Sequence, residues 1–282
     1  MKGIVAFLLG VVASFLACYC FYRIFVVDKT AYLPWMSNLF SDSSEIPRTV
    51  MQTYHKLDLV PQKVQDQFEE LAPGFARVLF DDTSAMEFME KHYGPNMVLL
   101  FESFRVGAFK ADLFRYCYLY VEGGIYMDIK TKLVKPIGEI YADLRNRECS
   151  LATCMTSRSF LAPHTWSGAG CAYQGIIFAK PRNPIFLECI EYMRQYSWRG
   201  SLDYLAFCKN FWERLRQRGV TGEGFHAPAG IVIWSEHLSI LTYKCMNKRN
   251  KKIPLCSTIV DPESGSTLFI SRFQDFPWRA SG

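Results

Sequence analysis

The stretch Gly107–Pro136 reads GAFKADLFRYCYLYVEGGIYMDIKTKLVKP and combines a helical pattern, a glycine pair and a strand pattern. Its first half, residues 108–120, repeats apolar side chains near the 3.6-residue period of an amphipathic helix. On such a helix Asp112 and Arg115 lie one turn apart, so both side chains can face the same cleft. They could also form an ordinary surface ion pair, which is worth only about 0.3–0.5 kcal/mol.

A glycine pair follows this predicted helix. Gly123 and Gly124 indicate its end, because glycine adopts the left-handed backbone of a helix cap without steric cost. Residues 125–129 then alternate apolar and polar side chains, as a short strand does. Asp128 is therefore expected at the end of a strand, beside the helix that carries the acidic and basic pair.

The order A-x-x-D-x-x-R, L-Y, G-G-I-Y and D closely resembles the signature of the DXD-containing sugar-binding-region glycosyltransferases. This family includes fungal Golgi α-1,6-mannosyltransferases and inositol phosphorylceramide mannosyltransferases. The similarity continues in three other segments. Ile46–Tyr54 resembles the family's opening strand, with the pattern I-P-x-x-x-x-Q-T-[WY], and Phe75–Asp82 resembles its second strand with an acidic end. Tyr173–Phe186 resembles a later strand, turn and helix start. A weaker similarity at Leu268–Trp278 predicts a terminal segment that folds back over the donor site.

The resemblance implies an enzyme, a retaining glycosyltransferase. It would move a hexose, with mannose favoured, from a nucleotide sugar (GDP-mannose or a UDP-sugar) to a glycan or glycolipid hydroxyl. The implied donor-binding residues are Gln52, Thr53 and Tyr54 for the nucleoside, Asp112 and Arg115 for sugar hydroxyls, and Asp128 for the ribose and donor sugar. The alternative is a catalytically silent membrane protein of the same fold that binds glycans or partners.

One residue departs from the family pattern. In the D-x-D motif the second carboxylate binds a divalent metal clamped on the diphosphate, whereas this chain has Lys130 there. An ammonium has donors and no acceptor, so it cannot ligate a hard cation such as Mn²⁺. Three outcomes are open: Asp128 and other groups hold Mn²⁺, Lys130 stabilises the leaving diphosphate instead, or activity is lost. We rank an active enzyme, with Asp128 and Lys130 as its catalytic residues, above an inactive one; a solvent-facing lysine is the plainer interpretation of Lys130.

Strand and helix patterns alternate through the centre of the chain. Apolar strands expected at Val98–Phe101, Ile125–Ile129 and Gly175–Phe178 are separated by helical stretches. This alternation indicates an α/β fold with a mostly parallel sheet covered by helices on both faces. In such sheets ligands bind at the carboxyl ends of strands, where Asp128 is expected. The family resemblance implies the nucleotide-sugar transferase fold known as GT-A.

The N-terminus predicts a membrane helix. No charged residue occurs from Gly3 to Tyr22 and the apolar run continues to Val27, which is long enough to cross a bilayer. An uncleaved signal anchor is favoured over a signal peptide, because the apolar run extends past the faint cleavage-like sequence within it. The expected organisation is an anchor at residues 1–27, a stem at 28–45 and one catalytic domain at 46–282. The resemblance implies a single-pass type II protein of the Golgi or ER membrane with a lumenal domain.

Charge and cysteine content complete the outline. The formal net charge of +5 is modest and the basic residues are dispersed, so no nucleic-acid partner is expected. Two of the ten cysteines lie in the predicted anchor, and the other eight permit disulfides in an oxidising lumen whose pairing the sequence does not select. Cys117 is expected to be a buried apolar residue of the signature helix.

Overall fold

The computed structural model describes residues 45–156, 171–196, 203–238 and 257–271, which lie within one compact unit. Its strands are β1 (Thr49–Thr53), β2 (Ala76–Phe80), β3 (Gly124–Met127), β4 (Lys132–Leu133), β5 (Leu151–Met155), β6 (Ala172–Ala179), β7 (Gly224–His226), β8 (Ile231–Leu238), β9 (Ser257–Val260) and β10 (Thr267–Ile270). Its helices are α2 (Gln62–Leu71), α3 (Asp82–Tyr93), α4 (Pro95–Ser103), α5 (Gly107–Val121), α6 (Ile137–Asn146), α7 (Pro184–Gln195) and α8 (Ala206–Arg216), with short 3-10 turns η3 (Leu57–Leu59) and η4 (Ala227–Ala229).

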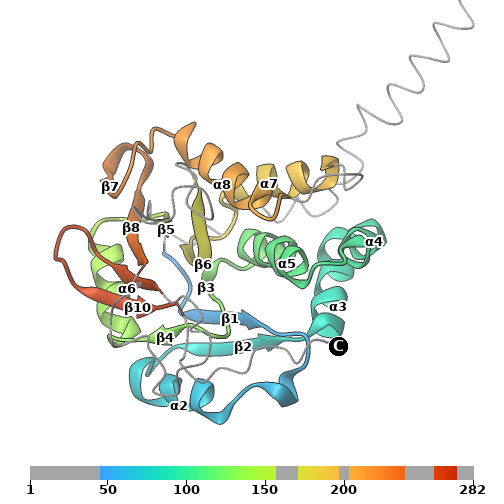
Figure 1. Cartoon of the computed structure of the whole chain (residues 1–282), viewed down its shortest axis with the longest axis horizontal. Coiled ribbons are helices and arrows are strands. Elements are labelled where there is room, and N and C mark those ends of the chain that lie inside the picture. The colour runs from blue at the N-terminus through green and yellow to red at the C-terminus, as the bar shows by residue number, and fades with distance from the viewer. Residues whose placement is uncertain (1–44, 157–170, 197–202, 239–256, 272–282) are drawn as a thin grey trace, which may run out of the picture. The chain divides into compact units, whose positions relative to one another are not determined.

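All these strands join one sheet in the order β2-β1-β3-β6-β5-β8-β9-β10-β4, with β7 paired to β8 (Figure 1). The sheet curls, and the chain itself shows why. In a flat sheet β3 and β4 would stand six strand spacings apart, roughly 29 Å at about 4.8 Å each. Only residues 128–131 connect them, and five Cα steps reach at most about 18 Å. The curl therefore brings β4 back beside the end of β3.

The expectation of a mostly parallel sheet is wrong. Parallel pairing joins β1 to β2, β1 to β3 and β5 to β8, whereas the other pairs, including β3 with β6 and β8 with β9, are antiparallel. The result is a mixed α/β fold. Buried strands are apolar on both faces whichever way their neighbours run, so an apolar run carries no information about strand direction.

A second expectation also fails, because the predicted strand Val98–Phe101 lies inside helix α4. Four apolar residues in a row fit a buried strand or a helix equally well. The deciding signal lies just before them, where Gly94 (φ +80°) is followed by Pro95 at the first helical position, a place that suits proline's fixed backbone angle. The other predicted elements hold: α5 is a helix, and β1, β2, β3 and β6 are strands at the expected places.

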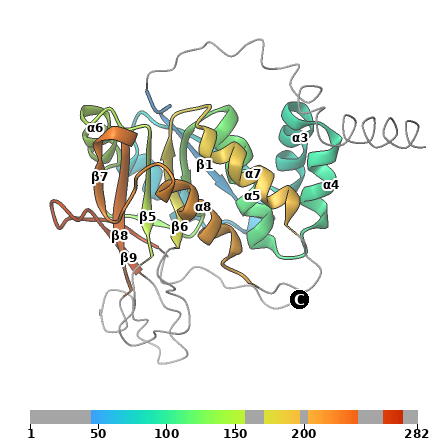
Figure 2. The ribbon, with the colours of Figure 1, turned by 90° about the horizontal axis from the view of Figure 1, so that it is seen from above.

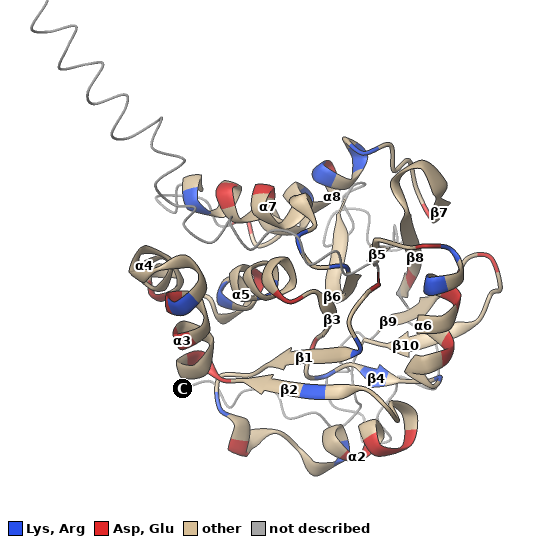
Figure 3. Cartoon of the chain, turned by 180° about the vertical axis from the view of Figure 1, so that it is seen from behind, with Lys and Arg blue, Asp and Glu red and all other residues tan. Residues whose placement is uncertain are grey.

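Helices cover both faces of the sheet (Figures 1 and 2). One face packs against α6 and part of α2 in a core that includes Ile125, Met127, Ile140, Phe178 and Trp234. The helices α5, α7 and α8 pack on the other side, and α5 is buried along its whole middle. Acidic and basic residues lie interspersed along α6, α7 and α8 (Figure 3).

The glycine pair after α5 is required by the close packing there. Gly123 and Gly124 have φ angles of +65° and +95°, which other residues adopt only with strain. A Cβ on Gly124 would stand 2.7 Å from the carbonyl oxygen of Thr49, and one on Gly123 would stand 2.5 Å from the nitrogen of Pro181. These glycines let β3 enter the sheet directly from a buried helix.

The predicted N-terminal anchor and stem and the predicted terminal segment lie wholly or partly outside the residues that the structure describes. The predicted anchor and nearly all of the stem lie outside these residues, and within the described ranges no helix is both long and apolar enough to span a bilayer. The terminal segment Leu268–Trp278 is described only to Ser271. Its first residues form β10, which pairs with β4 just after Asp128.

Cys117 is fully buried, as expected. Cys117 and the other described cysteines are free thiols.

Candidate active site

The carboxyl ends of β1, β3, β5 and β8 lie at one edge of the sheet. β1 is parallel to β3 and β5 is parallel to β8, while β6 runs antiparallel to both β3 and β5. The four strands therefore point the same way. Asp128 follows the last residue of β3, and its N–H donates to the carbonyl of Gly175 at 2.8 Å. This is the edge where α/β sheets bind ligands.

Helix α5 presents Asp112 and Arg115 to the same place. The two residues are only 7% and 6% exposed, and Arg115 Nη2 lies 3.2 Å from Asp112 Oδ1 and 3.6 Å from Asp128 Oδ1. One guanidinium thus bridges two carboxylates from different elements. The structure brings together the three residues that the sequence placed in one cleft.

The guanidinium of Arg115 is fixed from several directions. Its Nε donates to the carbonyl of Ala111 at 3.2 Å and its Nη1 to the carbonyl of Gln174 at 2.6 Å. Its planar face lies 4.3 Å from the ring centre of Tyr126, whose hydroxyl donates to Asp128 Oδ1 at 2.7 Å. A cation held this firmly loses little conformational freedom when a ligand binds.

The two carboxylates differ in charge behaviour. Burial raises the pKa of Asp112 to about 6, with Arg115 opposing the rise and Asp128 adding to it. Burial also acts to raise the pKa of Asp128, but Lys130, Arg115 and the hydrogen bond from Tyr126 together lower it below its usual value. At neutral pH Asp128 is therefore ionised, and Asp112 is the group of the pair that takes up a proton first on acidification.

Lys130 completes the cluster from the loop between β3 and β4. Its Nζ lies 3.5 Å from Asp128 Oδ2, and its side chain is 42% exposed. The loop is held in place, because the Thr131 N–H donates to the Asp128 carbonyl at 2.8 Å. The buried Gln67 of α2 donates to the Thr131 carbonyl at 3.1 Å and accepts from the Leu133 N–H at 2.9 Å.

These groups do not fit a divalent metal held by the protein. Such a cation takes oxygen ligands, and the position of the second motif carboxylate holds an ammonium that pairs with the first. Within the described ranges, no three His, Cys, Asp or Glu side chains gather where they could hold a metal ion.

The predicted nucleoside residues lie at the end of β1, next to β3. Gln52 is fully buried; its Oε1 accepts from Arg77 Nε at 2.9 Å and its Nε2 donates to the Asp128 carbonyl at 3.4 Å. It supports the Asp128 turn from inside. Thr53 and Tyr54 are half-buried, and Tyr54 packs against a small apolar cluster that includes Ile129. Their contacts with a nucleoside stay a prediction.

Sequence reasoning missed residues that reach this edge from other strands. Glu236, near the end of β8, accepts a hydrogen bond from Ser257 at 2.5 Å. Burial raises its pKa, and the Ser257 bond and the nearby Lys130 oppose the rise. The Tyr173 ring lies against Gly175, whose Cβ would stand 2.6 Å from it, and no described residue hydrogen-bonds its buried hydroxyl. A charge inside the apolar run IVIWSEHL was the available signal for Glu236.

The family described as "Glycosyltransferase sugar-binding region containing DXD motif" matches residues 11–150. Residues 11–150 are thus similar to the sugar-binding region of this family. The match includes α5, the glycine pair and Asp128, and it confirms the resemblance inferred from residues 107–136.

Three fungal relatives are similar over parts of the chain. Inositol phosphoceramide mannosyltransferase 3 of Schizosaccharomyces pombe is 34% identical over 92 residues, covering 32% of this chain and 25% of that protein. Mannosyl phosphorylinositol ceramide synthase SUR1 of Saccharomyces cerevisiae is 24% identical, covering 57% and 38%. The initiation-specific alpha-1,6-mannosyltransferase of the same yeast is 29% identical, covering 35% and 22%. The matches thus span less than two fifths of each relative's length.

Among solved structures, the PaToxG glycosyltransferase superimposes with a TM-score of 0.40 and 16% identity, covering 61% of this chain and 69% of that one.

Proposed function

We propose that this chain is a retaining glycosyltransferase that moves a hexose, mannose first among the candidates, from GDP-mannose or a UDP-sugar to a glycan or glycolipid hydroxyl. The observation that carries the proposal is the buried Arg115 held between Asp112 and Asp128 at the carboxyl edge of the sheet. It lies in the part of the chain that matches a sugar-binding family. We assign the fold to the GT-A class on the same grounds.

The chemistry of the three groups suits a hexose. Carboxylate oxygens accept hydrogen bonds from sugar hydroxyls, and the guanidinium donates to them. In this proposal Asp112 and Arg115 hold hydroxyls of the donor sugar, and Asp128 contacts the sugar and the ribose. Because Arg115 is already bonded to two backbone carbonyls and stacked on Tyr126, the site is organised before the donor arrives.

In this proposal Lys130 acts on the leaving group. As the bond between the sugar C1 and the diphosphate oxygen breaks, its electron pair passes to that oxygen, and the acceptor hydroxyl forms the new C1–O bond. The acceptor proton leaves with the diphosphate. An ammonium beside the developing negative charge stabilises it. Lys130 is exposed enough to reach a bound diphosphate, and Asp128 and the Gln67-held loop limit its freedom.

The acceptor proposal rests on the relatives and on the predicted anchor. Two relatives bear names that refer to mannosyl transfer on inositol phosphoceramide, and the third is an α-1,6-mannosyltransferase. If residues 1–27 anchor this chain in a Golgi or ER membrane, a stem at 28–45 spans at most about 60 Å. That tether would hold a lumenal site close to acceptors in the bilayer.

The test is donor hydrolysis and transfer by the full chain, with GDP- and UDP-sugars, with and without manganese. Asp128→Asn is expected to abolish turnover while leaving thermal unfolding close to that of the parent, because an asparagine oxygen can still accept from Tyr126. Asp58→Asn, the same change at an exposed residue of η3, is the control and should keep full activity. Normal turnover by Asp128→Asn would remove this residue from the site.

Lys130 also favours a second candidate, a catalytically silent protein that binds glycans or partners through the same edge. The two candidates differ in one result. A silent protein would bind a nucleotide sugar but release no nucleotide diphosphate, with or without a metal ion. Its Asp128→Asn variant would lose the binding.

A further inference from the structure

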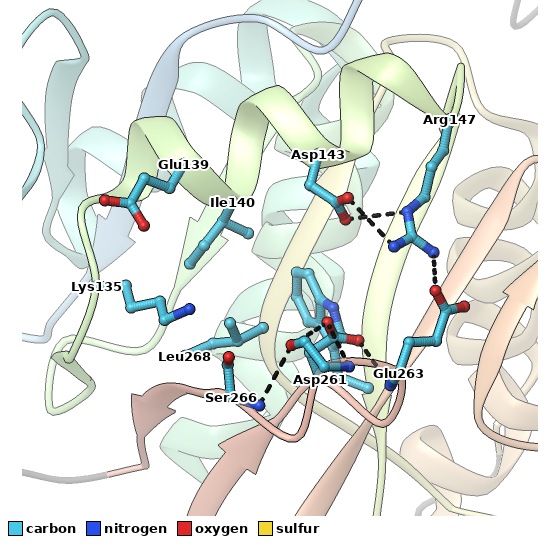
Figure 4. Close-up of a pocket in the computed structure, with 11 residues that line it drawn as sticks. Lys135, Glu139, Ile140, Asp143, Arg147, Asp261, Glu263, Ser266 and Leu268 are labelled. Atoms are coloured by element: carbon cyan, nitrogen blue, oxygen red, sulfur yellow. Dashed lines mark hydrogen bonds and ion pairs between the residues drawn. The ribbon is translucent and has the colours of Figure 1, made fainter.

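A cavity of about 410 Å³ lies between helix α6 and the turn that joins β9 to β10 (Figure 4). Its size falls within the roughly 300–1,000 Å³ of small-molecule sites. β9 begins at the catalytic edge beside the end of β8, because Ser257 pairs with Leu238, and it runs away from that edge. The turn at residues 261–266 therefore lies at the opposite edge of the sheet. The cavity is separate from the Asp128 site.

Most of the charged groups around the cavity are already paired. Arg147 contacts Asp143 at 3.0 Å and Glu263 at 2.6 Å, and the three close one end of the cavity (Figure 4). Asp261 accepts from the Ser264 hydroxyl at 2.6 Å and from the Glu263 N–H at 3.2 Å within its own turn. These groups build the walls and have little capacity left for a ligand.

Other groups lining the cavity have hydrogen-bonding capacity to spare. Among the described residues, nothing hydrogen-bonds or pairs with the Lys135 ammonium, the Ser266 hydroxyl, the Glu139 carboxylate or the indole N–H of Trp234. Trp234 is only 2% exposed, and it is one of the residues that line the cavity. In Figure 4 Lys135 points between Ile140 and Leu268, toward the middle of the cavity.

The lining selects a class of ligand. Its four carboxylates outnumber its two cations, which disfavours phosphates and other anions. A metal cation is disfavoured too, since only Glu139 is left as an unpaired carboxylate. The remaining features are three free donors, one free acceptor and the apolar surfaces of Ile140 and Leu268. A neutral sugar has hydroxyls that both donate and accept and C–H faces that pack on apolar surface.

We propose that this cavity is an accessory site for a neutral oligosaccharide, separate from the donor site. Lys135, Ser266 and Trp234 donate to its oxygens, Glu139 accepts from one hydroxyl, and Ile140 and Leu268 support a ring. In a transferase such a site would hold a distal part of a glycan acceptor. Only the choice of a mannose probe rests on the proposed function.

The experiment measures binding of α-linked mannotriose to the full chain in detergent by calorimetry and saturation-transfer NMR, without any nucleotide sugar. The expected result is one weak site that persists with saturating GDP-mannose. Lys135→Met and Ser266→Ala should each weaken binding by about two- to tenfold, as expected for one lost hydrogen bond. Ser266→Trp should fill the cavity and abolish binding. Lys132→Met, at an exposed residue of β4 outside the cavity, is the matched control and should bind normally.

Two further measurements keep the proposal separate from the catalytic one. Asp128→Asn should retain mannotriose binding even though it lacks turnover, so failure of the transferase proposal leaves this test intact. Mannose 6-phosphate should bind more weakly than mannose. No binding by the parent, unchanged binding by Ser266→Trp, displacement by GDP-mannose, or tighter binding of the phosphorylated sugar would each overturn the accessory site.

Discussion

Replacing Lys130 with alanine separates a catalytic lysine from a merely structural one, because the two roles predict effects of different size. The structural loss is small. Lys130 is 42% exposed and lies 3.5 Å from Asp128, and ion pairs of this kind contribute about 0.2–1 kcal/mol to the free energy of unfolding. For a domain of this size the melting temperature should fall by no more than about 2–4 °C.

The catalytic loss should be much larger. If the ammonium stabilises the diphosphate charge as the C1–O bond breaks, its removal should cost about 3–4 kcal/mol of transition-state stabilisation, a hundred- to thousandfold in kcat. The loop supports this size of effect, since Gln67 and the Thr131 turn fix the backbone of the loop that carries Lys130. A stabiliser that is already positioned needs no reorganisation when charge develops.

The assay is release of nucleotide diphosphate in the presence of a chelator, with melting temperature measured on the same preparations. Lys132→Ala removes the same charge from the exposed face of β4 and should lose less than about twofold. Lys130→Asp restores D-x-D and should make activity manganese-dependent. The reasoning fails if Lys130→Ala keeps parental activity while the parent requires manganese. The metal would then be held by Asp128 with ligands from elsewhere, the Leu268–Trp278 segment being the first place to look.

Burial raises the pKa of Asp112 from 3.8 to about 6, so folded protein keeps this proton longer than unfolded protein. As the pH rises from about 4 to 6, the contribution of Asp112 to the free energy of unfolding should therefore fall, and above pH 6 it should stay constant. The affinity for a nucleotide sugar should rise over the same change, as Asp112 becomes ionised. Calorimetric titrations that show the same affinity from pH 5 to 8 would exclude the Asp112 carboxylate from binding. Gly124→Ala should lower the free energy of unfolding by at least about 1–3 kcal/mol. The reason is that Gly124 has a φ of +95° and a Cβ there would stand 2.7 Å from the Thr49 carbonyl. Gly138→Ala is the control and should be neutral or slightly stabilising, because the space around Gly138 is open. Protease added to intact microsomes should spare the domain if it is lumenal, and digestion without detergent would reverse the proposed orientation.

The local part of the fold was predictable because neighbouring residues alone determine it. The apolar period of α5, the glycine pair and the alternation in β3 are all properties of consecutive residues, and the helix and strand formed where they indicated. The convergence of Asp112, Arg115 and Asp128 followed from helical spacing and from a turn too short to separate them. The sequence order also identified the sugar-binding family.

Longer-range features were not predictable from patterns of this kind. An apolar strand is the same whether its neighbour runs with or against it, so the antiparallel β6 and the curl that returns β4 to β3 could not be inferred from residue periodicity. Four apolar residues at 98–101 fitted a strand and became helix α4 because the preceding cap favoured a helix.

Tertiary structure alone decided which distant side chains join the cluster. Local residue order was enough to predict the Asp112, Arg115 and Asp128 cluster and to identify Lys130 as a substitution in the motif. The pairing of β1, β6 and β8 into the sheet then brought Glu236 and Tyr173 to the same edge, buried Gln52 beside the Asp128 turn, and left the cavity beside Trp234 at the opposite edge. These placements depend on strands that are distant in the sequence, as Gln52 and Asp128 are at 76 residues from each other, and their pairing is set by how the whole core packs rather than by any local pattern.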